Sequence, residues 1–471
     1  MPRRPRVSEV LIPFERGNGV PLRIQLQRAL RTAIQAGRLS AGARLPSSRV
    51  FAEQLGLSRG VVVDLYEQLA AEGYLISRRG SATHVANRVT SNLPGTPESE
   101  ALATPRYDFR PGRPDHSLFP RRAWLTCLRR VFASAPAAAL DYPDARGAHL
   151  ALVAIAEYLN RSRGTAARVD RTLLCAGFAQ GMRLVCEVFK AMGVRRIAVE
   201  DPGHAFESTE VRASGMELVP VPVDDRGICV DRLERLKVGA VYVTPAHQYP
   251  TGAVLSADRR AALLAWATKR SVWIVEDDYD GEYRYDREPI GALQGLSPER
   301  VIYIGSASKT LAPALRMGWV LSPELLIHHL SQAKLDADRG SAGIDQLTLA
   351  EFIDCGYLDR HLRRTRLIYR RRRAQLANAL GLYLPGFPIG GVAAGLHLTL
   401  DLPEGTDETA VIVEASRRRI HVHGMRAYEG RKGSGKPTLL IGYCCLPEAE
   451  IQDGAKALAA AIHAVRRRAG R

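Results

Sequence analysis

The chain has 471 residues, of which 46% are hydrophobic, so it can bury more than one core and we expect two or three domains. It holds 66 Lys and Arg against 49 Asp and Glu, a net charge of +17, which favours a polyanionic partner such as nucleic acid. The N-terminal MPRRPRVSEV lacks the apolar region of a signal peptide, and the chain has no run of 18 apolar residues. Secretion and membrane spanning are therefore not expected.

Seven cysteines are scattered without the spacing of a metal site, and Cys444 and Cys445 are adjacent, which a natural disulfide does not favour. We expect no metal and a reducing, cytoplasmic location.

Residues 1–18 are basic and rich in breakers, and we interpret them as a flexible arm. After Pro21, apolar residues recur every four positions and predict an amphipathic helix that ends at Gly37. Pro46-Ser47-Ser48 is a cap signal for a second helix that ends at Gly56.

Ser58 begins a third predicted helix, which ends at Gly73, and two short helices joined by Gly56-Leu57-Ser58 form a helix-turn-helix. Tyr74-Leu75-Ile76 and Thr83-His84-Val85 flank Arg78-Arg79-Gly80 and predict a small hairpin, the wing. Residues 1–90 carry 14 Arg, no Lys and 6 Asp and Glu, a local charge of +8. That concentration suits phosphate binding, although a small helical bundle with solvated arginines has the same spacing.

The stretch LPSSRVFAEQLGLSRGVVVDLYEQLAAEGYL resembles the winged helix-turn-helix of the GntR family of bacterial repressors. The resemblance implies that Arg49, Ser58 and Arg59 contact double-stranded DNA and that Gly80 lets the wing backbone approach the minor groove. The sequence departs from the family at Gly60, where threonine is usual, and in the Gly-Ser-Ala of the wing. We place this domain at residues 19–86.

Residues 87–107 are polar, hold three prolines and show no periodicity, so they are predicted to be a linker. From residue 108 to 471, apolar runs alternate with helical segments, the pattern of an α/β domain with a mostly parallel sheet. Polar residues follow each strand candidate, where open α/β sheets place their ligands. The strand candidates are 196–199, 240–243, 272–275 and 301–304.

Lys309 follows the last of these strands in GSASKTLAPALRMGW, with Ser306, Ser308 and Arg316 beside it. A lysine amine can form an imine, and the hydroxyls and the guanidinium can hold a phosphate. Taken alone, such a segment is more often a surface loop with one solvated lysine.

Asp277 and Tyr279 follow the third strand and project to one face in extended chain. The carboxylate could keep a pyridine nitrogen protonated, and the phenol could donate to the ring oxygen. His247, after the second strand, is a possible ring contact, although a lone histidine is more often structural.

His204, after the first strand, could stack on a cofactor ring, with Phe206 as its rival. The segment Cys175–Gly181 opens a helix whose backbone N–H groups, at Ala179 and Gln180, could cup a phosphate.

These residues together resemble the fold-type I pyridoxal-phosphate aminotransferases across roughly residues 108–465, and with the N-terminal domain the chain resembles the MocR/GabR-type subfamily of GntR regulators. The resemblance implies pyridoxal 5'-phosphate as cofactor and a head-to-tail homodimer. Lys309 would carry the internal aldimine, Asp277 would pair with the pyridine nitrogen and Tyr279 with the 3-oxygen. The other implied cofactor contacts are His204, His247, Ala179, Gln180, Ser306, Ser308 and Arg316.

Aminotransferases of this fold usually hold the substrate carboxylate with an arginine on a late strand, but Leu439–Tyr443 has none. Arg426 is the substitute candidate. Residues 357–380 predict a long helix with eight arginines and an apolar stripe, which favours a solvated basic face and leaves open an extended DNA surface.

The leading hypothesis is a transcription regulator that senses a small amino compound by aldimine exchange at Lys309, with at most weak transaminase activity. One alternative is a regulator that senses pyridoxal phosphate itself, and another is an active aminotransferase that carries a DNA-binding module.

Overall fold

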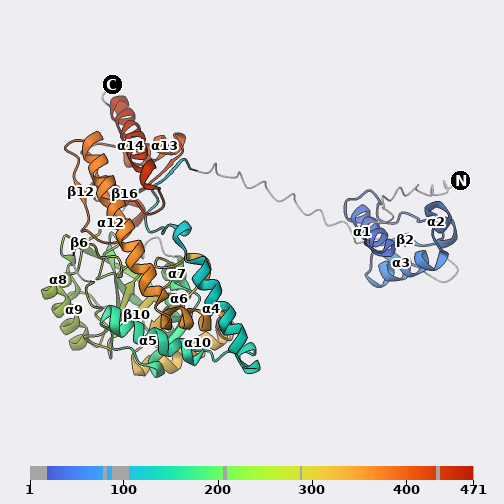
Figure 1. Ribbon diagram of the computed structural model, residues 1–471, viewed down its shortest axis with the longest axis horizontal. Coiled ribbons are helices and arrows are strands. Elements are labelled where there is room, and N and C mark those ends of the chain that lie inside the picture. Colours follow the sequence, from blue (N-terminus) through green and yellow to red (C-terminus); the bar gives the residue numbers. More distant parts are fainter. Residues whose placement is uncertain are drawn as a thin grey trace. The chain divides into compact units, whose positions relative to one another are not determined.

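The computed structural model describes residues 19–77, 82–86, 105–204, 209–286, 289–430 and 435–469 (Figure 1). The chain divides into two compact units, 1–102 and 103–471, and each is described by itself. Gly80 of the predicted wing, Phe206, residues 1–18 and most of the predicted linker lie outside the described residues.

The first unit contains the predicted helix-turn-helix. Its helices are α1 (Leu22–Gln35), α2 (Ser48–Leu55) and α3 (Arg59–Ala71), and its strands are β1 (Leu75–Ile76) and β2 (His84–Val85). The strands pair antiparallel with Leu75 opposite Val85, which confirms the predicted hairpin. Leu30, Phe51 and Leu65 belong to one buried core and fix the three helices against one another.

The two cap signals of this unit differ in the structure. Ser47 is the N-cap of α2, and its side chain accepts a hydrogen bond from the Val50 N–H. Gly56 ends α2 in the left-handed region, at φ 63°. Ser58 occupies the N-cap position of α3, but its side chain makes no capping hydrogen bond.

The second unit is built on an eight-stranded sheet with the order β4-β11-β10-β9-β8-β5-β6-β7. Neighbours from β10 through β9, β8 and β5 to β6 run parallel, whereas β11 is antiparallel to both β10 and β4. All four predicted strands are present. The strands are β4 (Thr172–Cys175), β5 (Arg196–Asp201), β6 (Glu217–Asp224), β7 (Gly227–Ile228), β8 (Ala240–Val243), β9 (Trp273–Asp278), β10 (Val301–Ser306) and β11 (Gly318–Leu321).

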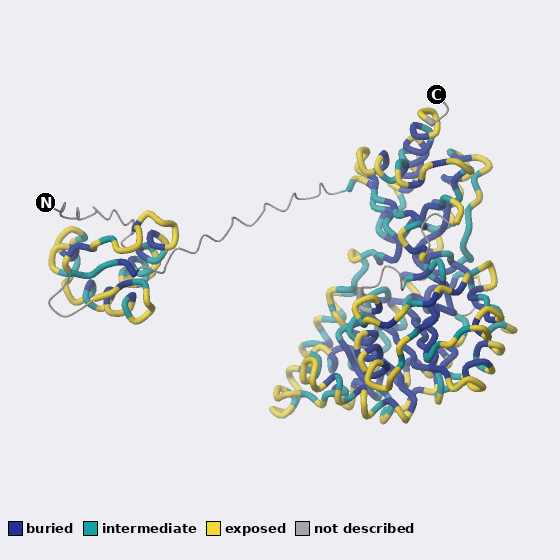
Figure 2. Tube along the Cα trace, turned by 180° about the vertical axis from the view of Figure 1, so that it is seen from behind, coloured by how far each residue is buried: buried dark blue, intermediate teal, exposed yellow. Residues whose placement is uncertain are grey.

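Helices cover both faces of this sheet because consecutive strand residues point to opposite sides. Ile274 belongs to the core that includes Leu263 of α9, whereas Val275 belongs to the core that includes Val185 of α6. Buried segments therefore fill the middle of the unit (Figure 2). The helices of this unit that precede α12 in the chain are α4 (Arg121–Ser134), α5 (His149–Arg163), α6 (Phe178–Ala191), α7 (Thr209–Ala213), α8 (Val230–Leu233), α9 (Ala257–Arg270), α10 (Glu324–Asp338) and α11 (Gly343–Asp354).

The long helix α12 (Tyr357–Tyr383) leads from the sheet to a C-terminal layer (Figure 1). That layer holds α13 (Glu408–Arg417), α14 (Glu448–Ala469) and a sheet of order β12-β13-β16-β15. Its strands are β12 (Ile389–Gly390), β13 (His397–Asp401), β16 (Thr438–Gly442) and β15 (His423–Gly424). A separate pair joins β3 (Tyr107–Asp108) to β14 (Ile420–His421), so structured chain begins before residue 108.

The arginines of α12 do not form a uniformly solvated face. Arg363, Arg364 and Arg370 are exposed. In contrast, the buried Arg372 pairs with Asp115 at 2.9 Å, and Arg366 donates to the Glu282 carbonyl oxygen. The expected solvated face is therefore correct for only part of the helix.

None of the seven cysteines, all of which lie within the described ranges, forms a disulfide bond. Within the described ranges, no helix is long and apolar enough to cross a membrane.

The two cap serines give a matched pair for a stability test. Ser47→Ala removes a capping hydrogen bond and should destabilise α2 by about 1 kcal/mol, which accelerates amide exchange in α2 of the full chain about fivefold. Ser58→Ala removes no capping bond and should change exchange in α3 much less. Equal effects of the two variants would contradict this account of the caps.

Candidate functional site

The candidate site lies at the carboxyl ends of the parallel strands β8, β9 and β10. In the register of β9 and β10, Ile304 lies opposite Asp277 and Gly305 opposite Asp278. The chain that follows β10 therefore leaves the sheet beside Asp277 and carries Lys309 with it. This arrangement agrees with the rule that open α/β sheets bind ligands at this edge.

Asp277 is buried at the end of β9 and accepts a 2.6 Å hydrogen bond from the Tyr242 hydroxyl. Burial raises the pKa of Asp277 to about 7, while the Tyr242 hydrogen bond and the nearby Lys309 charge act in the opposite direction. The carboxyl group is thus poised to gain or lose a proton near neutral pH. Tyr242 lies within an apolar strand and was not anticipated as a site residue.

Lys309 is half-buried, and desolvation of its amine lowers its pKa, although the charges of Asp280 and Asp277 oppose that shift. A lowered pKa increases the fraction of neutral, nucleophilic amine. Gly112 packs against it: a Cβ at this glycine, whose φ is +66°, would lie 3.4 Å from Lys309 Nζ. Lys309 also borders a cavity of about 670 Å³.

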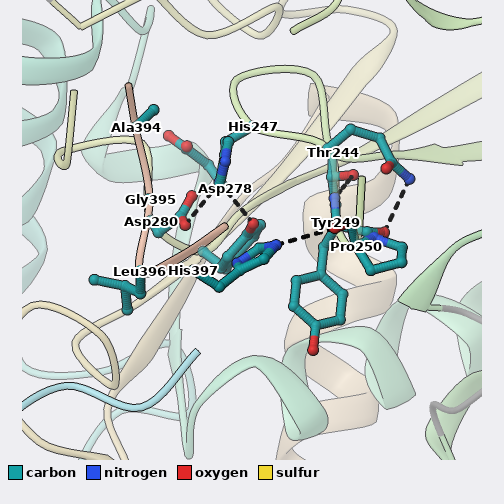
Figure 3. A network of polar contacts seen from close by, with 12 residues as sticks. Thr244, His247, Tyr249, Pro250, Asp278, Asp280, Ala394, Gly395, Leu396 and His397 are labelled. Atoms are coloured by element: carbon teal, nitrogen blue, oxygen red, sulfur yellow. Dashed lines mark hydrogen bonds and ion pairs between the residues drawn. The ribbon is translucent and has the colours of Figure 1, made fainter. Parts of the chain in front are cut away.

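His247 and Asp280 lie together in a polar network (Figure 3), which Tyr279 joins through His247. His247 Nδ1 lies 3.0 Å from Asp280 Oδ2 and 2.9 Å from the Tyr279 hydroxyl, so one ring nitrogen joins the carboxylate and the phenol. Burial raises the pKa of Tyr279 well above its usual range, so its hydroxyl stays protonated. The histidine therefore positions the phenol. Asp280 is a further site residue, and its place one position after Tyr279 in the acidic stretch Glu276–Asp280 could have suggested it.

His397 of β13 extends this network into the C-terminal layer. Its ring lies 5.3 Å from the His247 ring, and its Nε2 lies 3.0 Å from the Pro250 carbonyl oxygen (Figure 3). Burial lowers the pKa of His397 to about 3, so the ring is neutral at physiological pH.

The His204 ring lies 5.9 Å from the Phe178 ring and 5.8 Å from the Tyr249 ring. It therefore belongs to an aromatic group next to the start of α6.

An anion-binding end forms where α6 begins. Arg316 donates to the Ala176 carbonyl oxygen at 2.7 Å, and a Cβ at Gly177 would lie 3.4 Å from Arg316 Nη1. Gly177 is the N-cap of α6, so the N–H groups of its first turn, which includes Ala179 and Gln180, are directed toward the start of the helix, near which the guanidinium lies. A positive side chain and a helix N-terminus together suit a phosphate group.

The Gln180 side chain serves another purpose. Its Oε1 accepts from Lys334 Nζ at 2.8 Å, and its Nε2 donates to Asp338 Oδ2 at 2.7 Å. Only its backbone N–H remains for an anion.

Ser306 is buried at the end of β10 and lies opposite Gly318 in the sheet, while Ser308 is half-buried one residue before Lys309. A Cβ at Gly318 would lie 2.8 Å from Gly177 Cα, so the lysine segment and the start of α6 are in close contact.

Arg426 lies on a short helical turn of the C-terminal layer rather than beside Lys309. Its backbone N–H donates to Glu408 Oε1 at 3.1 Å. Burial raises the pKa of Glu408, and the charge of Arg426 opposes that rise.

In the first unit, Arg49 is exposed in the first turn of α2, and Ser58 and Arg59 are exposed at the start of α3, the second helix of the helix-turn-helix. A Cβ at Gly60 would lie 4.0 Å from Ser58 Oγ, so the usual threonine would fit there.

Comparison with known proteins accounts for both units. Residues 22–85 match the gntR family of bacterial regulatory proteins, and residues 114–458 match the aminotransferase class I and II family. An uncharacterized HTH-type transcriptional regulator of Bacillus subtilis, YdeL, is 34% identical over 96% of this chain and 99% of its own length.

The HTH-type pyridoxine biosynthesis transcriptional regulator PdxR of Corynebacterium glutamicum is 33% identical over 87% of this chain and 89% of that protein. The probable rhizopine catabolism regulatory protein MocR of Rhizobium meliloti is 34% identical over 77% of this chain and 78% of its own.

Among solved structures, a multiple substrate aminotransferase from Thermococcus profundus superposes with a TM-score of 0.71 at 27% identity, covering 78% of this chain and 93% of that one. The fold is therefore that of the pyridoxal-phosphate aminotransferases and implies use of that cofactor. The chain belongs to the MocR/GabR-type subfamily of GntR regulators, DNA-binding transcription regulators in which a helix-turn-helix precedes an aminotransferase-like domain.

Proposed function

We propose that this regulator binds pyridoxal 5'-phosphate and senses a small amino compound at Lys309. The observation that carries the proposal is the half-buried, desolvated amine of Lys309 beside the buried carboxyl group of Asp277. One end of the site is acidic, and the other, at the start of α6, is positive. A cofactor with a pyridine nitrogen at one end and a phosphate at the other fits this polarity.

The residues would hold the cofactor as follows. Asp277 pairs with the ring nitrogen, Tyr279 donates to the ring oxygen and His204 stacks on the ring. His247 keeps the phenol in place through its 2.9 Å contact. Ser306, Ser308, Arg316 and the first turn of α6 receive the phosphate.

When bound, pyridoxal phosphate supplies an aldehyde carbon with which amines condense. Lys309 offers the amine of this chain, and the lowered pKa keeps a larger share of it unprotonated. An effector amine competes with Lys309 for the same carbon, and this competition is the sensing event.

The regulatory output requires that the effector bind two arrangements of the protein with different affinity, since a ligand shifts an equilibrium only by its differential binding. We further propose that the active species is a head-to-tail homodimer bound to double-stranded DNA.

One observation favours a second candidate function. The PdxR relative is named for pyridoxine biosynthesis, so this chain could instead sense the cofactor itself. Transamination has weaker support. The segment Leu439–Tyr443, which covers most of β16 and the residue after it, carries no arginine for a substrate carboxylate.

Visible absorbance of wild type and Lys309→Ala with added pyridoxal phosphate tests the central step. We expect the band of a lysine-bound cofactor in wild type and in Lys269→Ala, a matched variant at an exposed lysine, but not in Lys309→Ala. Titration with amines and amino acids should shift the band for one or two compounds.

A wild-type protein without the band would refute the proposal. A band that no amine shifts, combined with DNA affinity that depends on the cofactor, would favour the second candidate.

The Asp277 pKa gives a prediction for cofactor affinity. In a Lys309→Ala background, which lacks the charge that opposes the rise of the Asp277 pKa, affinity should fall as the pH drops through a midpoint above about 7, because Asp277 gains a proton and loses its attraction for a protonated ring nitrogen. Tyr242→Phe removes the hydrogen bond that stabilises the carboxylate, so the midpoint should move to higher pH. Calorimetric titration measures both, and Asp277→Asn should abolish the transition. An unchanged midpoint in Tyr242→Phe would argue against this role of Tyr242.

The proposed DNA contacts can be counted from salt dependence. For a random duplex, the slope of log K against log salt should decrease by about 2 in Arg49→Ala/Arg59→Ala, since each phosphate contact contributes about 0.9. Pyridoxal phosphate binding should persist. Arg28→Ala, at an exposed arginine of α1, is the matched control and should change the slope much less. An unaltered slope in the double variant would exclude these contacts.

A further inference from the structure

The cavity that Lys309 borders has an unusual charge. Its lining includes Arg113, Arg121 and His116 in addition to Lys309, and none of the described residues that line it is Asp or Glu. The cavity is therefore an open, positively charged pocket next to the proposed reacting amine. Such a surface attracts a ligand that carries a negative charge.

Arg113, which lines the same cavity as Lys309, lies on a tightly anchored segment. Gly442 N–H donates to the Phe109 carbonyl oxygen at 2.8 Å, and a Cβ at Gly442 would lie 2.2 Å from the Arg110 carbonyl oxygen. Cys445 Sγ lies 3.4 Å from the Arg113 carbonyl oxygen. The end of β16 and the chain after it thus fix the backbone that carries Arg113.

The Arg113 guanidinium is available for a ligand. Asp108 is occupied by Arg110, whose Nε and Nη2 reach its two carboxylate oxygens at 2.8 and 2.5 Å. Arg113 Nη1 lies 4.0 Å from Asp108, and its side chain is 40% exposed. Arg113 and Lys309 line the same cavity, and the charge of Arg113 helps to lower the pKa of the Lys309 amine.

Arg426 is less suited to this task, because it lies on a short helical turn of the C-terminal layer and does not line this cavity. No described contact joins Arg426 to Lys309 or to the cavity.

We propose that Arg113 recognises the anionic group of the effector while the effector amine occupies the place of Lys309. Arg113 would thereby take over the carboxylate-binding task for which β16 has no arginine, from a segment that β16 itself anchors. The effector class is a small amine with a carboxylate or a similar anion. This inference rests on the proposed function.

A chain-length series tests the assignment. The probes are glycine, 3-aminopropanoate, 4-aminobutanoate and 5-aminopentanoate, each paired with an alkylamine that has a methyl group in place of the acid. Wild type should respond to at least one amino acid at far lower concentration than to its alkylamine, as measured by the visible absorbance shift.

Arg113→Ala should weaken the best amino acid about 10- to 100-fold, because a charge-assisted hydrogen bond is lost, and should change the alkylamine less than about threefold. Arg113→Lys should show an intermediate loss, since the charge stays but the fork geometry does not. Arg122→Ala, at an exposed neighbour of Arg121 outside the cavity, is the matched control. Retention of the cofactor band reports that each variant is folded.

A second readout does not depend on amine chemistry. Butanoate, which has the acid without the amine, should raise the melting temperature of wild type and Arg122→Ala but not of Arg113→Ala. If the absorbance test of Lys309 fails while this stabilisation appears, the proposed sensing step is wrong and the anion site stands. Equal responses to amino acids and alkylamines, or an Arg113→Ala variant that keeps the preference for the acid, would overturn the inference.

Discussion

The site depends on one buried ion pair beneath it. Arg163 of α5 donates from Nε to Asp278 Oδ2 at 2.6 Å, from Nη2 to Oδ1 at 3.0 Å and from Nη1 to the Gly281 carbonyl oxygen at 3.0 Å. Tyr303 of β10 donates to the same carboxylate at 2.8 Å. Asp278 lies between Asp277 and Tyr279, so the pair fixes the segment that presents both. Removal of one partner from such a pair costs about 3–5 kcal/mol, because a buried charge is left without compensation.

Besides this ion pair, the region of the site contains several buried carboxyl groups, whose removal from water is unfavourable for their charged form. Burial raises the pKa values of Glu200, Glu276, Asp277 and Glu282 to about 7. Glu276 is satisfied by the backbone N–H groups of Leu293 and Gln294, and Glu200 by Thr244. Asp277 differs because the charge of the Lys309 amine, a group that can respond to a ligand, acts on it in addition to the Tyr242 hydrogen bond. Carboxyl groups that are held by structural hydrogen bonds and a carboxyl group close to the proposed reacting amine therefore lie in the same part of the unit, and the groups around each carboxyl distinguish them.

The sequence predicted the elements whose periodicity is regular and the residues that directly follow strands. The helix-turn-helix, the parallel strands and the placement of Asp277 near Lys309 all follow from such local patterns. Tyr242 could not be found in this way, because a tyrosine in an apolar strand has the pattern of a core residue. Arg113 lies in a loop with no periodicity, and its proximity to Lys309 depends on contacts with residues more than 300 positions later. The burial of Arg372 was not predicted for a different reason. Arg372 shares the helical spacing of the buried Leu358 and Tyr369, so an analysis of the apolar face of the helix that also counts arginine would find it.

The pairing of β3 with β14 has a mechanical consequence. Tyr107 and Asp108 attach the chain that leaves the predicted linker to the C-terminal layer, and within a few residues the same chain passes Gly442 and reaches Gly112 beside the Lys309 amine. The segment from Tyr107 to Gly112 is therefore held by strand pairing at one end and by close backbone packing at the other. The C-terminal layer and the surroundings of the Lys309 amine are joined by the same few residues of chain, so a rearrangement of either one has to be accommodated by this segment.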